Sequence, residues 1–200
     1  MTTKIIAVKD ISLLQDSELI ATSINGREDS FEELVKRYQR PIISYVYRML
    51  KDYDASLDVT QEVFIKVYKS LERYNSAYKF STWLYRIAHN ATIDYIRRRA
   101  DKEQSIENET DEGTYQLQFE SSSPTPEQNH ELREWHSEVE SVVNCLPIVY
   151  RELVILRHGK ELSYGEIVEV TGLPLGTVKN RLFRAREMMR EIFIERELKF

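Results

Sequence analysis

Apolar residues recur with helical spacing along most of the chain, and polar cap residues mark where several helices begin. The pattern predicts a short helix over 16–24, ended by Asn25-Gly26. Ser30-Phe-Glu-Glu33 has the spacing of a capping box, in which a hydroxyl and a carboxylate satisfy free backbone amides. It predicts a long helix from there towards Leu50, bent near Pro41. No stretch alternates as a strand would.

Two more helices are expected in the first half, from about Asp54 to Leu71 and from Ser81 to about Arg99. The connection between them, Tyr74 to Phe80, is a polar and aromatic loop. Residues 101–124 have no apolar period and many acids, and they include Ser121-Ser-Ser-Pro124. We predict a flexible linker there.

The last third of the chain predicts four further helices. Two of them begin with capping boxes, Thr125-Pro-Glu-Gln128 and Ser163-Tyr-Gly-Glu166, and a Gly172-Leu173 turn precedes the last. The expected helices cover about 125–146, 148–158, 163–171, and 174 to beyond 192. The fold class that follows is all-α: two small helical bundles, over 12–100 and 125–195, joined by a flexible acidic linker over 101–124. The second bundle contains a helix-turn-helix.

The last helix has two different faces when each residue is rotated by 100°. Its buried stripe is predicted to be Val178, Leu182, Ala185 and Met189. The opposite face carries Asn180, Phe183 and Arg184, with Lys179 at its margin and Arg181 among the basic residues that crowd the helix. A recognition helix needs such an apolar side, which holds it in its bundle, and donors that project into the major groove.

Gly176 and Thr177 lie in the first turn of that helix, where backbone amides would be open to a phosphate. A charge-rich helix face is more often a plain solvated surface. The turn and the capping box before this helix are what favour DNA binding.

The helix from Ser81 has one face that combines an aromatic ring with guanidinium and amide groups. Its core face is expected to hold Leu84, Ile87, Ala88, Ala91 and Tyr95. A different face carries Trp83, Arg86, Asn90 and Arg97. The adjoining loop adds Tyr74, Asn75, Tyr78, Lys79 and Phe80. Exposed bases stack on aromatic rings and cations follow the phosphates, so the cluster suits single-stranded nucleic acid. For any one ring, a place in the core is the alternative.

The helix from Asp54 also has two faces. Val63, Phe64, Val67, Tyr68 and Leu71 are expected on its inner side. Asp58, Gln61, Glu62 and Ile65 lie together on the other side. Such a patch is usually solvated surface. It would equally serve as a docking patch for a protein partner, with Ile65 as the desolvated contact, and the pattern leaves both readings open.

The composition excludes wholesale disorder, because 42% of the 200 residues are hydrophobic. The net charge of −5 is unevenly spread: residues 101–140 carry 2 Lys/Arg against 12 Asp/Glu, whereas residues 1–100 carry 16 against 13 and residues 141–200 carry 10 against 8. Two mildly basic units joined by an acidic connector favour a nucleic-acid partner.

Several function classes are disfavoured. The longest stretch without a charged residue, 141–150, is far shorter than the roughly 20 residues of a membrane span, and the N-terminus lacks the apolar core of a signal peptide. Cytoplasmic location is therefore expected. The single cysteine, Cys145, is expected to pack in a core rather than act as a nucleophile. The histidines form no metal-ligand cluster and no glycine-rich phosphate loop is present, so we expect no catalytic residues, metal, cofactor or small-molecule substrate.

Several motifs together resemble one known family. Asp58-Val-Thr-Gln-Glu-Val-Phe64, and Phe80-Ser-Thr-Trp-Leu-Tyr-Arg-Ile-Ala-His-Asn90 with Asp94-Tyr-Ile-Arg-Arg98, look like region 2 of bacterial sigma factors. Gly172-Leu-Pro-Leu-Gly-Thr-Val-Lys-Asn-Arg-Leu-Phe-Arg-Ala-Arg186 resembles their region 4. With only these two regions, the chain is similar to the extracytoplasmic-function (ECF) group of the sigma-70 family.

The resemblance implies a dissociable specificity subunit of RNA polymerase, not an enzyme. In the family, the face that holds Asp58, Gln61, Glu62 and Ile65 docks on the clamp coiled coil of the polymerase β′ subunit. The loop over 74–80 and the Trp83 face would receive unpaired bases of the −10 element. The face with Lys179 and Phe183 would read the −35 element as duplex, and the outer part of region 4 would hold the β flap.

The resemblance also implies that the acidic linker threads towards the polymerase active centre, and that an anti-sigma factor, often membrane-anchored, restrains the protein. A helix-turn-helix regulator that binds duplex DNA without polymerase is the alternative function. It would account for residues 125–195, yet it leaves the two-faced helices and the aromatic loop of the first half unexplained.

Overall fold

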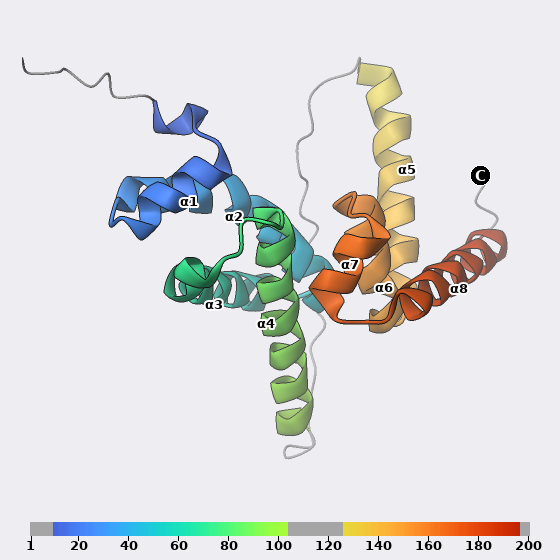
Figure 1. The fold of residues 1–200 in the computed structure, drawn as a ribbon. Helices are drawn as coiled ribbons and strands as arrows, with labels where there is room; N and C mark the ends of the chain where they lie inside the picture. Colours follow the sequence, from blue (N-terminus) through green and yellow to red (C-terminus); the bar gives the residue numbers. More distant parts are fainter. Residues whose placement is uncertain (1–9, 104–125, 197–200) are drawn as a thin grey trace, which may run out of the picture.

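The computed structural model describes residues 10–103 and 126–196, and these ranges contain helices and no strand (Figure 1). The prediction of an all-α fold is confirmed. The first bundle consists of η1 (Ile11–Leu13), α1 (Asp16–Ile24), α2 (Glu28–Leu50), α3 (Tyr53–Ser70), η2 (Leu71–Arg73) and α4 (Phe80–Glu103). The second consists of α5 (Pro126–Cys145), α6 (Ile148–Val154), the π-helical turn η3 (Ile155–Gly159), α7 (Tyr164–Thr171) and α8 (Leu175–Glu195).

The expected linker is described only at its start. Helix α4 runs on to Glu103, so the first three residues assigned to the linker, 101–103, are helical. The rest of the linker and the capping box expected at Thr125 lie outside the described residues.

The core of the first bundle lies between α2, α3 and α4. Ile42 of α2, Val63 of α3 and Leu84 of α4 are fully buried there. Burying such side chains contributes roughly 1.5–3 kcal/mol each, which makes this core the main source of the bundle's stability. Pro41 lies inside α2, and the helix continues past it.

The start of α2 differs from the prediction. The helix begins at Glu28, so Ser30 lies inside its first turn and not at the cap. Ser30 is buried, and its hydroxyl accepts a 2.7 Å hydrogen bond from the Thr22 hydroxyl of α1. The capping box expected at Ser30 is therefore wrong, because the side chain joins α1 to α2 instead of capping a helix.

The hydrophobic core continues into the second bundle, where Leu146, Leu153, Ile167 and Leu182 are buried. Cys145 does not belong to it. The thiol is exposed at the end of α5 and accepts a 3.1 Å contact from the Arg196 guanidinium. The expectation that Cys145 packs in a core is wrong.

The two bundles contact one another, mainly through α2 and α4 of the first and α6 and α7 of the second (Figure 1). At the centre of this junction the Glu152 side chain of α6 is buried, with 6% of the residue exposed. The Tyr45 hydroxyl donates a 2.6 Å hydrogen bond to its Oε1, and Nδ1 of His89 contacts the same oxygen. A buried carboxylate is tolerated where such partners satisfy it, so Glu152 ties α6 to both α2 and α4.

Other polar contacts surround Glu152 at the junction. Arg48 of α2 pairs with Glu140 of α5 at 2.7 Å. The ammonium group of Lys160, which follows η3, lies 5.9 Å from the centre of the Tyr85 ring of α4. Contacts on several elements therefore hold the bundles in one arrangement.

Candidate nucleic-acid interface

The loop between η2 and α4 is held in shape by its own hydrogen bonds. The Tyr74 hydroxyl donates to the Tyr78 carbonyl over 2.5 Å, and the Asn75 side-chain oxygen accepts from the Ala77 amide over 2.9 Å. Side-chain bonds of this kind fix a turn without regular secondary structure. Tyr78 and Lys79 are exposed, so an ordered loop presents both to solvent.

Aromatic rings pack behind the loop. The Phe80 ring lies 5.3 Å from that of Tyr38, 5.7 Å from that of Tyr74 and 5.8 Å from that of Trp83, measured between centroids. Pairs of this geometry each contribute about 0.5–1.5 kcal/mol beyond burial. Only 4% of Phe80 is exposed, so a base cannot stack on it. The expected base contact of Phe80 is therefore wrong: it is a core residue that supports Trp83.

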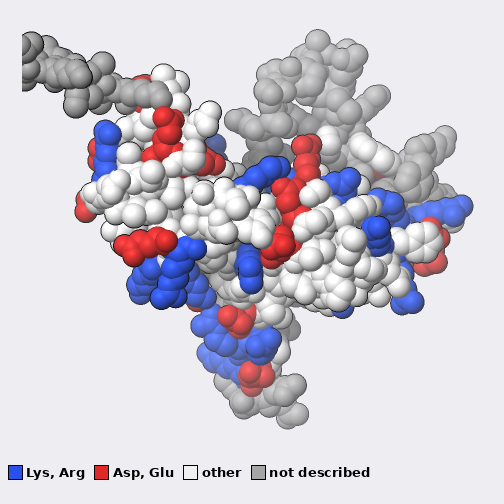
Figure 2. All heavy atoms as spheres, viewed as in Figure 1, with Lys and Arg blue, Asp and Glu red and all other residues white. Residues whose placement is uncertain are grey.

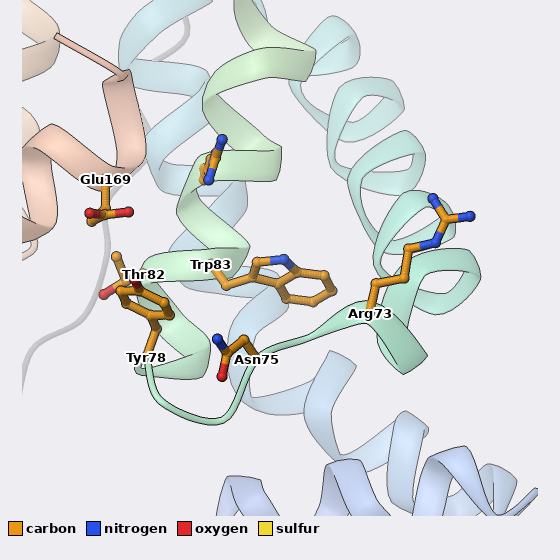
Figure 3. A pocket seen from close by; sticks show the side chains of 7 residues that line it. Arg73, Asn75, Tyr78, Thr82, Trp83 and Glu169 are labelled. Carbon is orange, nitrogen blue, oxygen red and sulfur yellow. The ribbon is translucent and has the colours of Figure 1, made fainter.

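Trp83 forms one wall of a cavity of about 250 Å³ beside this loop (Figure 3). The lining residues are Arg73, Asn75, Tyr78, Thr82, Trp83, Arg86 and Glu169. Asn75, Tyr78, Trp83 and Arg86 belong to the surface that the sequence assigned to single-stranded nucleic acid. The structure therefore brings these four together around one concave site.

Three of the lining residues, Arg73, Thr82 and Glu169, were not singled out from the sequence. Arg73 ends η2, just before the loop, and Thr82 lies on the first turn of α4. The Thr82 hydroxyl is buried and has no hydrogen-bond partner in the part of the chain that the structure describes. The sequence could have indicated Thr82, because it precedes Arg86 by four residues and residues at that spacing are neighbours on one helix face.

Asn90 and Arg97 are exposed further along α4 but do not line the cavity. Basic side chains gather around the last turns of this helix (Figure 2). Arg98 pairs with Glu62 at 3.4 Å, whereas Arg97 makes no ion pair with any residue in 10–103 or 126–196. The Arg97 guanidinium is thus available to an anion such as phosphate.

The patch on α3 is exposed, as expected. Asp58 and Gln61 face solvent and 48% of Ile65 is exposed. Glu62 is half-buried and pairs with Lys66 at 2.7 Å. The hydrogen bond from Lys66 lowers the pKa of Glu62 against the opposing effect of burial, so the patch keeps its negative charge.

Tyr68 was expected on the inner side of α3, and that expectation is wrong, because 59% of the residue is exposed. It follows Gln61 and Ile65 at helical spacing and so extends the same face. Its ring lies edge-on to that of Phe31, with centroids 5.0 Å apart, which orients it. The α3 patch therefore has more apolar area than the sequence pattern indicated.

The helix-turn-helix has the caps that the sequence predicts. The Ser163 hydroxyl accepts from the Glu166 amide, and the Glu166 carboxylate accepts from the Ser163 amide, so the capping box of α7 is confirmed. Gly172 ends α7 with φ +69, a left-handed conformation that favours glycine. The capping box therefore fixes the start of α7, and Gly172 fixes its end.

Helix α8 divides as predicted. Val178, Leu182 and Ala185 are buried, whereas Met189, the fourth residue of the expected stripe, is half-buried against the core. On the opposite side Lys179, Asn180, Phe183 and Arg184 are exposed, and Gly176 is open at the start of the helix. The exposed fraction of Phe183, 62%, is unusual for a large apolar ring and makes it a candidate contact.

Arg181 and Thr177, which the sequence also assigned to duplex DNA, are less exposed than that face, because both are half-buried. Arg181 lines a second cavity, of about 190 Å³, together with His89 and Glu152 at the junction of the bundles. In this arrangement the Arg181 side chain is therefore turned away from the face that Phe183 occupies.

Residues 10–103 and 126–196 contain neither a candidate membrane span nor a candidate metal site. None of the helices there has both the length and the apolar character of a membrane span. No cluster of three or more His, Cys, Asp or Glu side chains in the same ranges is arranged to hold a metal ion.

Comparison with known proteins matches both bundles. The family described as sigma-70 region 2 matches residues 34–102, and the family described as sigma-70, region 4 matches residues 136–189. The ECF RNA polymerase sigma factor SigW of Bacillus subtilis is 37% identical over 168 residues, which cover 83% of this chain and 90% of the relative. The chain belongs to the ECF group of the sigma-70 family.

Another relative of this sigma factor is the ECF RNA polymerase sigma-E factor of Escherichia coli K12, 36% identical over 179 residues that cover 87% of this chain and 92% of that protein. The sigma factor RpoE of Bartonella quintana, solved with the anti-sigma factor NepR, has the same fold: the TM-score is 0.66 at 19% identity, over 82% of this chain and 96% of that one.

A sigma factor is a DNA-recognition subunit of RNA polymerase and not itself an enzyme. This sigma factor therefore binds core polymerase and directs transcription initiation at promoters. The alternative, a helix-turn-helix regulator that acts without polymerase, does not account for the region 2 match over 34–102.

Proposed function

We propose that this sigma factor captures unpaired bases of the −10 element at the cavity beside Trp83, while α8 reads the −35 element as duplex. The cavity is the observation that carries the proposal, because it unites two aromatic rings, one side-chain amide and two guanidinium groups on one concave surface. We assign region 2 to residues 12–100 and region 4 to residues 125–195, joined by the linker over 101–124.

The chemistry of the cavity suits an extruded base. Removing a base from the stack costs a few kcal/mol. Stacking on an aromatic side chain contributes about 1–3 kcal/mol per base, so Trp83 and Tyr78 offset much of that cost. Arg73 and Arg86 supply cations for the phosphates on either side. Asn90 and Arg97 continue the path along α4.

The exposed face of α8 suits the major groove. Arg184 and Lys179 can donate to guanine, and Asn180 can bond adenine in a bidentate fashion. The Phe183 ring fits against a thymine methyl group. Backbone amides at Gly176 and Thr177 would hold a phosphate at the start of the helix, and Arg181 would join them where the bundles separate.

The α3 patch is the surface that we propose for the clamp coiled coil of the β′ subunit. Ile65 would be the desolvated centre, and Asp58, Gln61 and Glu62 would form a polar rim. The outer part of region 4 would hold the β flap. Polymerase would then hold both bundles at a fixed spacing, which makes the second DNA contact intramolecular and raises its effective concentration.

Two further assignments belong to the proposal. An anti-sigma factor would restrain this protein by covering its polymerase-binding faces, as suggested by the complex of the Bartonella relative with NepR. The site of action would be the cytoplasm, where core polymerase and promoters are found. No cofactor or small-molecule substrate enters the scheme.

Abortive transcription with core polymerase tests the −10 assignment, on promoters found by mapping the transcripts that the reconstituted enzyme makes genome-wide. Trp83→Ala and Arg86→Ala should each lower open-complex formation by about tenfold or more. Arg27→Ala removes an exposed arginine that does not line the cavity and should leave open-complex formation unchanged. Wild-type activity in both cavity variants would refute the assignment.

A further inference from the structure

A second concave site lies at the junction of the two bundles, apart from the cavity beside Trp83. This junction cavity has a volume of about 190 Å³, and its wall comes from α4, α6, α7, α8 and the turn between the last two helices. It shares no lining residue with the cavity beside Trp83. The junction cavity is therefore a separate site, and Arg181 is the one residue of its wall that we assign to DNA.

One part of the wall is apolar. It consists of four aliphatic side chains: Ile93, Ile148, Val149 and Leu173. Ile148 and Leu173 pack against the buried core, whereas 43% of Val149 is exposed. The apolar part of the wall is thus supported by the core and can still be reached from solvent.

The polar part of the wall contains two charged groups with different surroundings. The Glu152 carboxylate has protein partners, because its Oε1 accepts from the Tyr45 hydroxyl and contacts Nδ1 of His89. Arg181 is half-buried, yet its guanidinium makes no hydrogen bond or ion pair with any residue in the described part of the chain. A guanidinium that has lost some of its water without a counter-ion gains from an added anion.

The two parts of the wall together define a ligand. A carboxylate matches the planar fork of a guanidinium through two parallel hydrogen bonds. The aliphatic side chains favour an apolar body, which loses contact with water when it packs against them. An apolar cavity of about 150 Å³ is large enough for one benzene molecule, so the junction cavity has room for one ring with a carboxyl group. A second negative charge on the ligand would be repelled by Glu152.

We propose that the junction cavity binds a small aromatic monocarboxylic acid of about the size of benzoate. The carboxylate pairs with Arg181, and the ring lies against the four aliphatic side chains. This site goes beyond the proposed function and does not depend on the DNA contacts assigned above.

Such a ligand would contact both bundles at once. Ile93 belongs to α4 of the first bundle, whereas Val149 and Arg181 belong to α6 and α8 of the second. A molecule that binds the folded chain and not the unfolded chain stabilises the folded chain by mass action. The midpoint of thermal unfolding should therefore rise with the concentration of benzoate.

Fluorine NMR of 4-fluorobenzoate, titrated with the full chain, tests the proposal directly. The wild-type chain should bind one molecule with a Kd of about 1 mM or tighter. Neutral 4-fluorobenzamide has nearly the same shape and should bind about tenfold more weakly. Arg181→Gln should weaken binding of the acid by about tenfold and leave the amide unchanged. Arg190→Gln removes an exposed arginine of α8 outside the cavity and should change neither.

A second variant fills the cavity without changing its charge. Val149→Phe replaces a partly exposed apolar residue by a larger one, and it should weaken binding of both the acid and the amide by about tenfold or more. Leu175→Phe makes a similar change at an exposed position of α8 that does not line the cavity, and should leave both affinities unchanged. Thermal unfolding without ligand verifies that each variant folds.

Four results would overturn the proposal. The first is the absence of saturable binding of 4-fluorobenzoate up to about 10 mM. The second is equal affinity of the wild-type chain for the acid and the amide, and the third is an equal loss of both in Arg181→Gln, because either would show that the guanidinium does not recognise the charge. The fourth is tighter binding of 4-fluorobenzylamine than of the acid, which would assign recognition to Glu152 and a cation.

Discussion

Tyr45 of α2 and Glu152 of α6 lie 107 residues apart in the sequence and share a buried hydrogen bond of 2.6 Å. Burial and the neighbouring Glu152 charge raise the pKa of Tyr45 well above its usual value, so the hydroxyl remains protonated and donates. This bond links the region 2 bundle to the region 4 bundle. It therefore bears on the stability of the chain and on the relative placement of the two surfaces that we propose for DNA.

Tyr45→Phe deletes only the hydroxyl and leaves His89 as the partner of Glu152. A hydrogen bond to a charged group contributes about 1.5–3 kcal/mol, and we expect the free energy of unfolding in urea at neutral pH to fall by that amount. Tyr95→Phe, at a half-buried position of α4, should change it by less than about 0.5 kcal/mol. A Tyr45→Phe unfolding curve that overlays the wild-type curve would show that the bond does not stabilise the junction.

The lowered pKa of Lys160 should make the stability of the chain depend on pH. Burial, with a smaller contribution from Arg48, lowers the pKa of Lys160 from 10.5 to about 8. Between pH 8 and 10.5 the unfolded chain holds a proton that the folded chain has released, so stability should rise with pH across that window.

Comparison with Lys160→Met isolates this effect. The substitution should remove the rise and make the chain more stable at pH 7 by about 1–2 kcal/mol, a range that allows for the solvent that still reaches the ammonium group. The measurement is thermal or urea unfolding of both proteins at pH 7 to 10. Parallel stability curves for the two proteins would contradict the assigned pKa.

A substitution at Gly172 should destabilise the chain through backbone conformation alone. No atom lies within 4 Å of a Cβ built at Gly172, but its φ of +69 is unfavourable for other residues. Gly172→Ala should therefore lower the free energy of unfolding by about 1 kcal/mol. Gly176→Ala, also in open space but inside α8, should leave stability unchanged or raise it, because alanine favours a helix. Equal effects at the two glycines would exclude backbone conformation as the cause.

Substitution of Ile65 should weaken the binding of the chain to core polymerase. Ile65→Glu places a charge at the centre of the α3 patch and should weaken binding to core polymerase by about tenfold or more. Ile24→Glu, at another exposed isoleucine on α1, should leave binding unchanged. The affinities are compared by fluorescence anisotropy of the labelled chain titrated with core polymerase. Unchanged affinity for Ile65→Glu would move the docking site to another face.

The helices and their faces could be predicted from the sequence because their signals are local. Helix α1 has the expected bounds, and the Ser163 box and Gly172 act as the pattern indicated. The prediction of a capping box at Ser30 was wrong although its pattern is just as local, because the Ser30 side chain makes a tertiary contact with Thr22 instead. The predicted burial of Tyr68 was wrong for a related reason. Helix α3 is packed on one side only, so a residue at the edge of its apolar stripe stays exposed.

The candidate site was predictable only in part. The polar and aromatic character of the loop indicated Asn75, Tyr78, Trp83 and Arg86, and these line one cavity. The roles of Glu152 and Glu169 could not be predicted, because both depend on how two bundles far apart in sequence pack together. Helical periodicity describes each helix against its own core and carries no information about a contact between bundles.

We propose that two separate surfaces of the chain, held in place by core polymerase, melt the −10 element and bind the −35 element as duplex. The decisive measurement is the permanganate reactivity of unpaired thymines, combined with a nuclease footprint on the same promoter. Reactive thymines in the −10 element should appear only when the chain and core polymerase are both present, and Trp83→Ala should suppress them while the −35 footprint persists. Melting by the chain alone, or loss of both signals together in Trp83→Ala, would contradict the account.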